Sequence, residues 1–364
     1  MAETTISTNG QVIKFLREFA REWNRNNRLS EYAGKGLNNI ISQKVDKGPT
    51  VRHSLVTRLK GPGVRGSDEL RGKGEAIGNY TWDTNPTWER NAVEFNKEDL
   101  EKTNLALMGE ARPLLMEWCK NLTRDEQIQA MGAIYNGTTY ANMADATEAA
   151  KDAWLVTNKA RTQFGAYASG GSAGGSDHSA DLAQIDATAD KFTYSRLRDM
   201  RMLAEDADPH IHPYQTNEQG EVYVVFAGSV ACRDFRASLD TINQNADVRG
   251  MKITSDGNIL ARDGDMFFEG TIIRKVPEIT GNFSATGKPL AAAGASGVTV
   301  EAAFLCGMQA LSHGLGGAPG IVVDREWDFQ FRPAVAIEVK QDVKKTFFNS
   351  YQHGMVTGYF SGVK

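Results

Sequence analysis

The stretch that decides the fold is residues 51–95, which read VRHSLVTRLKGPGVRGSDELRGKGEAIGNYTWDTNPTWERNAVEF. Between Lys60 and Gly78 it holds six glycines and seven charged residues, with few apolar residues among them. Such a segment cannot bury a core of its own. Its flanks alternate polar and apolar residues, as strands do. The pattern predicts a long β-hairpin with a projecting, mobile tip that becomes ordered against a partner, because an isolated two-stranded hairpin is marginal in water.

The segment before this hairpin is basic. Residues 1–60 carry eleven Lys or Arg against five Asp or Glu, a balance of +6, whereas the whole chain carries −4 and the remainder therefore −10. Apolar residues from Val12 to Trp23 recur at helical spacing and predict a helix in this arm. A basic arm on an acidic body suggests an anionic partner. A helix with one solvated basic face is the open alternative.

The remaining chain mixes helical and strand patterns and indicates an α+β fold. An apolar stripe from Leu100 to Leu122 predicts a long helix, and Pro113 predicts a kink or break in it. Thr123 and Glu126 form a capping box that opens a separate helix. Further helices are expected at 145–164, from Thr193, at 229–239 and at 300–311, and strands at 221–226, 270–276 and within 327–348.

The sequence holds no complete catalytic constellation. Gly61 to Gly66 match GxGxxG, but no helix opens at the last glycine, so a dinucleotide site is excluded. His210 and His212 lie on one face of an extended segment near Asp206 and Asp208, where zinc would need three or four converging ligands. A metal-dependent hydrolase using His210 and His212 remains the weaker alternative. We expect no metal, no cofactor and no enzymatic activity.

Composition supports an ordinary globular protein. The 364 residues are 41% hydrophobic and 24% charged, which excludes collagen, coiled coil and general disorder. Cys119, Cys232 and Cys306 form no CxxC spacing and are expected to be buried free thiols. The N-terminus lacks the pattern of a signal peptide, and no run is apolar enough to span a membrane. These features predict a protein of cytosolic origin.

Several stretches, taken in order, resemble one family. They read RLSEYAGKG (28–36), LVTRLKGPGVRG (55–66), WERNAV (88–93), YVVF (223–226) and VKKTFFN (343–349). The chain resembles the major capsid proteins of tailed double-stranded DNA bacteriophages, which share the Hong Kong 97-type capsid fold. It is most similar to the subgroup named after the coat protein of coliphage N-four. No single motif is sharp, but the likeness spans nearly the whole chain.

The resemblance implies a domain plan. It implies an N-terminal arm, an extended loop that overlaps the adjacent subunit, a peripheral domain with a long spine helix, an axial domain around capsomer centres, and a return to the peripheral domain with C-terminal strands. Matched segment by segment, the arm is residues 1–50 and the extended loop is 51–95. The peripheral domain is 96–204 with the spine helix at 97–122, the axial domain is 205–295, and the return with the C-terminal strands is 296–364.

The resemblance also implies function and partners. It implies a coat protein that assembles into hexamers and pentamers of an icosahedral shell around packaged double-stranded DNA. It is assembled in the bacterial host cytoplasm with a scaffolding protein, a portal protein and a cement or decoration protein. A shell of capsid ancestry that encloses protein instead of a genome is an open alternative.

Two sets of residues are expected to serve this assembly. Subunit contacts are expected at the loop tip and base, with two tryptophans as apolar anchors that could equally pack on their own hairpin: Lys60, Arg65, Asp68, Glu69, Arg71, Lys73, Glu75, Trp82 and Trp88. The basic arm is expected to face DNA or scaffold through non-specific, salt-dependent contacts, with Lys14, Arg17, Arg21, Arg25 and Arg28.

Overall fold

The computed structural model describes residues 27–61, 63–97, 107–171, 174–216, 220–240, 266–324 and 331–364. The chain divides into two compact units. The smaller unit contains residues 87–122 and 317–340, and the larger unit contains residues 28–86, 123–316 and 341–364. The predicted arm helix, and the expected strand residues near Trp327, lie outside the described residues.

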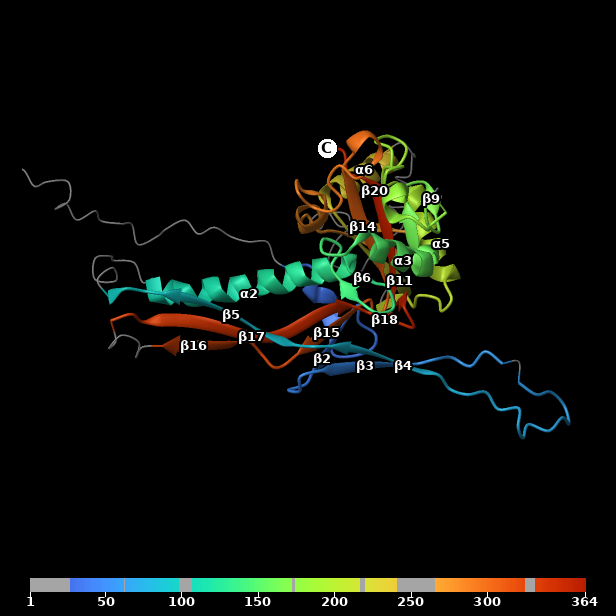
Figure 1. Ribbon diagram of the computed structural model, residues 1–364, viewed down its shortest axis with the longest axis horizontal. Coiled ribbons are helices and arrows are strands. Elements are labelled where there is room, and N and C mark those ends of the chain that lie inside the picture. Colours follow the sequence, from blue (N-terminus) through green and yellow to red (C-terminus); the bar gives the residue numbers. More distant parts are fainter. Residues whose placement is uncertain are drawn as a thin grey trace, which may run out of the picture. The chain divides into compact units, whose positions relative to one another are not determined.

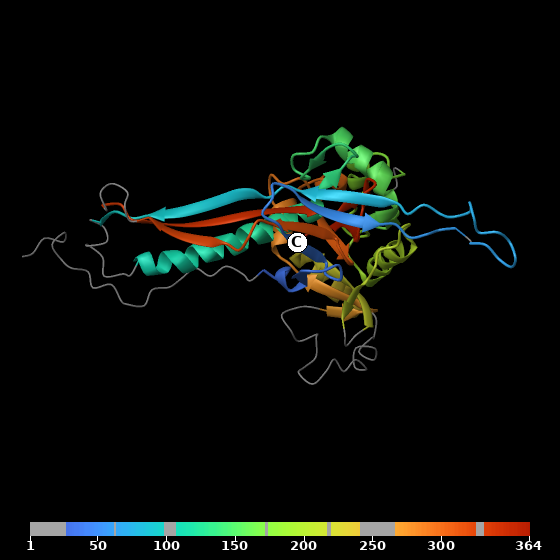
Figure 2. The same cartoon turned by 90° about the horizontal axis from the view of Figure 1, so that it is seen from below.

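The smaller unit packs one helix on three strands of a six-stranded sheet. Strand β17 (Ala334–Lys345) pairs with β5 (Thr87–Glu94) and antiparallel with β16 (Gly320–Asp324). Every second residue of β17 is buried, as expected for a strand with one covered face. Helix α2 (Leu107–Gly132) runs beside β17 (Figures 1 and 2). Their shared core consists of Ala111, Leu115, Cys119, Val335, Ile337 and Val339.

The larger unit is built on an eight-stranded sheet with helices around it (Figure 1). Its strands in spatial order are β12 (Met266–Phe268), β13 (Thr271–Lys275), β11 (Gly220–Ala227), β14 (Val300–Cys306), β20 (Met355–Ser361), β8 (Thr162–Phe164) and β9 (Tyr167–Ala168), with β10 (Tyr214–Thr216) on β11. The α-helices of this unit, besides the end of α2, are α3 (Glu148–Asn158), α4 (His178–Leu182), α5 (Tyr194–Asp206) and α6 (Ser229–Asp240).

The other strands of the six-stranded sheet join early and late segments of the chain. Strand β15 (Leu311–Leu315) pairs parallel with β2 (Ile41–Val45) and antiparallel with the end of β17. The remaining elements are the strands β1 (Ala33–Gly34), β3 (Val51–Val56), β4 (Asn79–Thr84), β6 (Ile134–Tyr135), β7 (Tyr140–Ala141), β18 (Phe347–Phe348) and β19 (Tyr351–Gln352), and the short helical turns Ser30–Tyr32, Lys159–Arg161, Thr280–Ser284 and Ala295–Gly297.

Most of the elements expected from the sequence are confirmed. The α+β class, the helix capped at Thr193 (α5), the strand at 221–226 (β11), the helix at 229–239 (α6) and the strand at 270–276 (β13) are all present. The helix expected at 145–164 is shorter, because Thr162–Phe164 form β8. The three cysteines are buried free thiols, as expected. The described helices include none with the length and apolar character that a bilayer crossing requires.

The break that was one of the two outcomes expected at Pro113 is absent, and the prediction of a separate helix from Thr123 is wrong. Helix α2 contains Pro113 and continues through Thr123 without the expected break. A proline removes one intrahelical hydrogen bond, but Leu115 and Cys119 pack on β17 and Ile128 and Met131 are buried in the larger unit, so tertiary packing outweighs the local signal. The Thr123 hydroxyl donates to Gln341 Oε1 at 3.0 Å instead of capping a new helix.

The helix expected at 300–311 is instead the strands β14 and β15. All seven residues of β14 are buried. Ala302 and Phe304 belong to one apolar cluster, while Ala303 and Leu305 belong to another. Because both faces of this central strand are covered, its sequence has no polar alternation, and a short apolar run of this kind cannot be told from a buried helix.

Candidate functional site: the projecting hairpin

Strands β3 and β4 form the predicted hairpin, which projects from the larger unit. The prediction is wrong for the end of the segment, because Thr87–Glu94 form β5, which pairs with β17 and belongs to the smaller unit. Strands β3 and β4 are antiparallel, with a register from Val51 opposite Thr84 to Val56 opposite Asn79. The connecting residues 57–78 extend beyond the strands as a long loop (Figures 1 and 2, blue). Gly63, Gly66 and Gly72 have φ of 70°, 70° and 82°. Nothing lies within 4 Å of a Cβ added there, so glycine is needed for the left-handed backbone and not for close packing.

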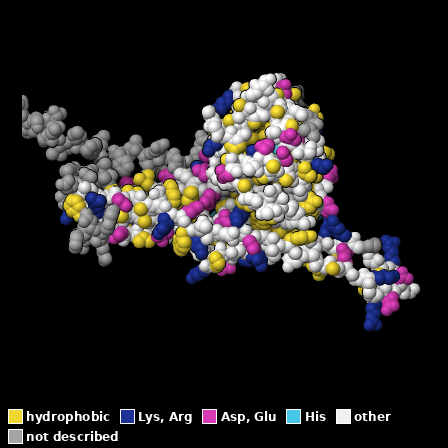
Figure 3. All heavy atoms as spheres, in the orientation of Figure 1, with side chains coloured by type: hydrophobic (Ala, Val, Ile, Leu, Met, Phe, Trp, Pro, Cys, Tyr) yellow, Lys and Arg dark blue, Asp and Glu magenta, His cyan; other side chains and the backbone are white. Residues whose placement is uncertain are grey.

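The loop has few contacts within the chain. Arg65, Asp68, Glu69, Arg71 and Lys73 are exposed and form no ion pair with the described residues. Figure 3 shows charged side chains of both signs over this loop. Four large apolar side chains in or beside the loop are also exposed to solvent, namely Val56, Leu59, Leu70 and Ile77. The loop therefore offers both apolar and charged groups that its own subunit leaves uncovered.

Two of the seven expected tip charges are used inside the subunit. The Glu75 carboxylate accepts hydrogen bonds from the backbone N–H groups of Lys60 and Gly61, each at 2.6 Å. These bonds hold the pKa of Glu75 below its usual value and join the two arms of the loop. Lys60 Nζ lies 2.9 Å from Asp208.

Asp208 attaches the root of the loop to the body of the larger unit. Its carboxylate accepts from Lys60 Nζ at 2.9 Å and from Arg58 Nη2 at 2.8 Å. The hydrogen bond from Lys60 is the main cause that lowers the pKa of Asp208. All three side chains are exposed, so these pairs are weak and sensitive to salt. This contact could not be predicted from local sequence patterns, because the partners are about 150 positions apart.

The two tryptophans at the base of the hairpin differ. Trp82 packs within its own subunit, with ring centroids 5.2 Å from Tyr135, 5.9 Å from Tyr140 and 5.6 Å from Phe347. Trp88, on β5, is 63% exposed. Trp82 thus stabilises the base of the hairpin, while Trp88 is the tryptophan with a surface available to another molecule.

The basic arm lies largely outside the described residues, and this holds for Lys14, Arg17, Arg21 and Arg25. Arg28 is described and partly buried, and its Nη1 donates to the Lys275 carbonyl at 3.2 Å. The expected contact of the arm with DNA or scaffold is therefore untested, and Arg28 has a structural role within the larger unit.

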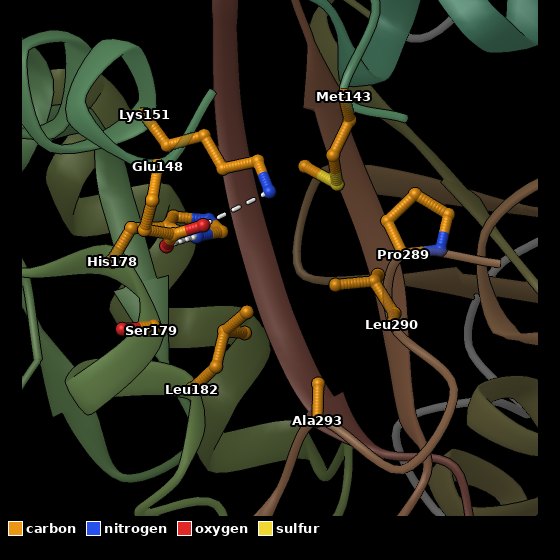
Figure 4. A pocket seen from close by; sticks show the side chains of 9 residues that line it. All are labelled: Met143, Glu148, Lys151, His178, Ser179, Leu182, Pro289, Leu290 and Ala293. Atoms are coloured by element: carbon orange, nitrogen blue, oxygen red, sulfur yellow. Dashed lines mark hydrogen bonds and ion pairs between the residues drawn. The ribbon is translucent and has the colours of Figure 1, made fainter. Parts of the chain in front are cut away.

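Neither candidate for enzymatic chemistry has a matching geometry. The rings of His210 and His212 lie 4.3 Å apart, but among the described residues no three His, Cys, Asp or Glu side chains gather into a metal-binding group. A cavity of about 170 Å³ contains Glu148, Lys151, His178 and Ser179 (Figure 4). There the Ser179 hydroxyl donates to Asp177 at 2.9 Å, so it is not paired with the histidine as a nucleophile would be.

The comparisons with known proteins decide the family. The family model described as "Phage capsid protein" matches residues 4–359. The chain belongs to the phage capsid protein family. No curated protein matches it.

Solved capsid structures are similar over nearly the whole chain. The capsid of cyanophage Pam1 is 28% identical with a TM-score of 0.84, covering 99% of both chains. The capsid of Ralstonia phage GP4 is 17% identical with a TM-score of 0.73, covering 100% of this chain and 99% of that one. The capsid of Helicobacter pylori bacteriophage KHP30 is 11% identical with a TM-score of 0.63, covering 99% and 97%.

The protein is thus a phage major capsid protein with the Hong Kong 97-type fold. It forms the icosahedral head by association with further copies of itself, and it is a structural component of the virion capsid and not an enzyme. The metal-dependent hydrolase and the protein-enclosing compartment are the less well supported interpretations, since the matching family is that of phage capsids.

Proposed function

We propose that residues 51–95, which comprise the hairpin, its loop and strand β5, overlap the adjacent subunit and make the contacts that join copies into hexamers and pentamers. The observation that carries this proposal is the combination of uncovered apolar and charged side chains on one projecting segment. Several exposed apolar side chains on one segment, with polar residues around them, are typical of an interaction surface. The interface residues are Lys60, Arg65, Asp68, Glu69, Arg71, Lys73, Glu75 and Trp88, with Trp82 supporting the base from inside.

The loop is suited to contacts that differ between hexamers and pentamers. Glycines with positive φ allow the backbone to adopt conformations that other residues avoid, so one sequence can fit neighbours at different angles. Mixed charges give weak pairs, which allow wrongly placed subunits to dissociate during assembly. The apolar residues supply the larger part of the binding free energy once they are covered.

The finer assignments follow the sequence resemblance. The chain would belong to the N-four-like subgroup, with the arm at 1–50, the peripheral domain at 96–204, the axial domain at 205–295 and the return segment at 296–364. Assembly would involve a scaffolding protein, a portal protein and a cement or decoration protein. The arm would make non-specific, salt-dependent contacts with packaged double-stranded DNA.

The loop proposal is tested by reversing charges at its tip. An Arg65→Glu, Arg71→Glu variant is compared with a Lys47→Glu, Lys288→Glu variant, which makes the same charge change at exposed sites outside the loop. Both should melt like the wild type. Only the loop variant should lose shells in electron micrographs and in light-scattering mass. Normal shells from the loop variant would contradict the interface assignment.

The arm proposal has its own test. Removal of residues 2–26 spares Arg28 and its bond to Lys275, so the described body keeps its contacts. The truncated protein should form shells that retain less DNA at raised salt, or should fail to recruit scaffold. Unchanged assembly together with unchanged genome retention would contradict a role for the arm.

A further inference from the structure

A second, larger cavity lies at the root of the hairpin. It has a volume of about 340 Å³ and belongs wholly to the larger unit. Strands β2, β3, β15 and β18 each contribute side chains to it. Ser312, Thr346 and Phe348 are buried at its floor, whereas Lys44, Arg52 and Ser54 are exposed at its mouth. None of its twelve lining residues is an aspartate or a glutamate.

The cavity is rich in hydrogen-bond donors that the chain itself does not use. Lys44 Nζ donates one hydrogen bond, to the Arg52 carbonyl at 2.8 Å, and an ammonium group has three donors. The hydroxyls of Ser312 and Thr346 lie 2.8 Å apart. One of them donates to the other, so one hydroxyl proton remains for a third group. The Nε2 atom of His53 is buried and has no hydrogen-bond partner.

The charges around the cavity leave an uncompensated cation. The Asp83 carboxylate is engaged by Arg52 through two hydrogen bonds of 2.8 Å. The Asp342 carboxylate lies 3.3 Å from Lys344 Nζ. Each of these two acids therefore already faces a cation of its own, and Lys44 has no carboxylate partner among the described residues.

His53 is the titratable group that responds to this environment. Burial, and next the charge of Lys44, lower the pKa of His53, while Asp83 acts in the opposite direction. The neighbouring His313, which is buried on β15, has its pKa lowered to about 4, mainly by burial. His53 is therefore neutral at pH 7, but an anion placed beside it would favour its protonated form.

We propose that this cavity is a binding site for a single oxyanion, held by Lys44, His53 and the hydroxyl pair of Ser312 and Thr346. Binding is coupled to the uptake of one proton from solvent by His53, so that both ring nitrogens become donors. The geometry fits a compact group with several acceptor oxygens, because its donors come from three strands and from the link between β17 and β18, and all line one space. The oxyanion is either free inorganic phosphate or a carboxylate of another copy of the chain.

The test is calorimetric titration of the full-length chain with inorganic phosphate in a chloride buffer at pH 6.5. We expect one phosphate per chain. Lys44→Met should weaken binding about tenfold or more, because it removes a charged hydrogen-bond donor to the anion. Lys47→Met is the matched control, since Lys47 is an exposed lysine that does not line the cavity, and it should bind like the wild type.

Proton uptake provides the second measurement. The heat of binding should change with the ionisation enthalpy of the buffer, and the slope sums the proton taken up by His53 and any proton exchanged by phosphate itself. His53→Gln keeps a donor at this position but cannot take up a proton, so its slope should differ from that of the wild type by up to one proton, and what remains is the contribution of phosphate. A slope unchanged in His53→Gln would overturn the coupling to His53.

Comparison of dissociated subunits with assembled shells distinguishes the two sources. Phosphate bound equally by both forms indicates a free anion as the natural ligand. Phosphate bound by subunits but excluded from shells indicates that a carboxylate of a neighbouring copy occupies the site. No binding by either form, or an equal loss in Lys44→Met and Lys47→Met, would overturn the proposal.

Discussion

Strand β14 and the hairpin strands β3 and β4 are all paired antiparallel, but they differ in what covers them. All seven residues of β14 are buried between two apolar clusters. In the hairpin, burial is confined to Val51 and Thr84 at its root, and exposure increases toward the loop. The first region is stabilised within one subunit. The second has unused contact surface, which is what assembly requires.

The largest expected effect tests the buried side of this comparison. Phe304→Ala on β14 should lower the free energy of unfolding by about 3–5 kcal/mol, because Phe304 is fully buried against Phe283 at a centroid distance of 5.8 Å. Ile77→Ala in the hairpin loop is the counterpart, since Ile77 is 67% exposed. Denaturant unfolding should show little change for Ile77→Ala. A similar loss of unfolding free energy in both variants would contradict the difference in burial between β14 and the hairpin loop.

A buried cation at the end of β17 gives a pH-dependent prediction. Lys345 is fully buried, with Nζ 3.3 Å from Thr357 Oγ1 and 5.4 Å from the centroid of the Trp154 ring. Burial lowers the pKa of Lys345 from 10.5 to about 7. Between these two values the unfolded chain binds more protons than the folded one, so stability should rise with pH by about 1.4 kcal/mol per unit.

The Lys345→Met variant isolates this contribution. Methionine retains most of the side-chain volume and removes the charge, so the variant should unfold at higher denaturant concentration at pH 7. Its stability should no longer rise between pH 7 and 10. A slope equal to that of the wild type in this interval would assign the pH dependence to other groups.

Substitution of Trp82 and of Trp88 should have opposite consequences for the subunit and for the shell. Trp82→Ala should cost about 3 kcal/mol of subunit stability, because Trp82 loses contact with Tyr135, Tyr140 and Phe347. Trp88→Ala should leave thermal unfolding of the subunit within about 0.5 kcal/mol of the wild type and should reduce shell yield. The reverse pattern would show that the base of the hairpin is supported from outside the subunit.

The smallest expected effect concerns the attachment of the loop by Asp208. Asp208→Asn removes the charge that pairs with Arg58 and Lys60. The melting temperature should not change measurably, because these groups are exposed. Limited proteolysis within residues 57–78 should become faster, and the difference should disappear at high salt. Equal cleavage rates at low salt would show that the pairs do not restrain the loop.

Local signals predicted the hairpin because they lie inside the segment itself. Glycine and charge at Lys60–Gly78, between alternating flanks, are enough to specify two strands and an open tip. The same reasoning failed at β14, where both faces are covered, and at Pro113 and Thr123, where packing overrides local preferences. The partners of Trp82 and Asp208 could not be predicted from local patterns, because each comes from a segment distant in sequence.

The residues of the proposed subunit contacts are close together in the sequence, whereas those of the oxyanion cavity are far apart. The charges of the loop could be named from the sequence because they adjoin one another. The cavity unites Lys44, His53 and Ser312, which come from three strands, with Thr346, which links β17 to β18. None of these residues stands out by itself, and only the pairing of β15 with β2 brings the late residues to the early ones.

Alkylation of the three cysteines would report the order in which the two units unfold. Cys119 is buried in the core of the smaller unit, whereas Cys232 and Cys306 are buried in the larger unit. Burial also raises the pKa of the Cys306 thiol, so little reactive thiolate is present while the fold is closed. Alkylating reagents will therefore trap each thiol only when its own core opens. Mass spectrometry of the trapped sites would show in which order the two units unravel.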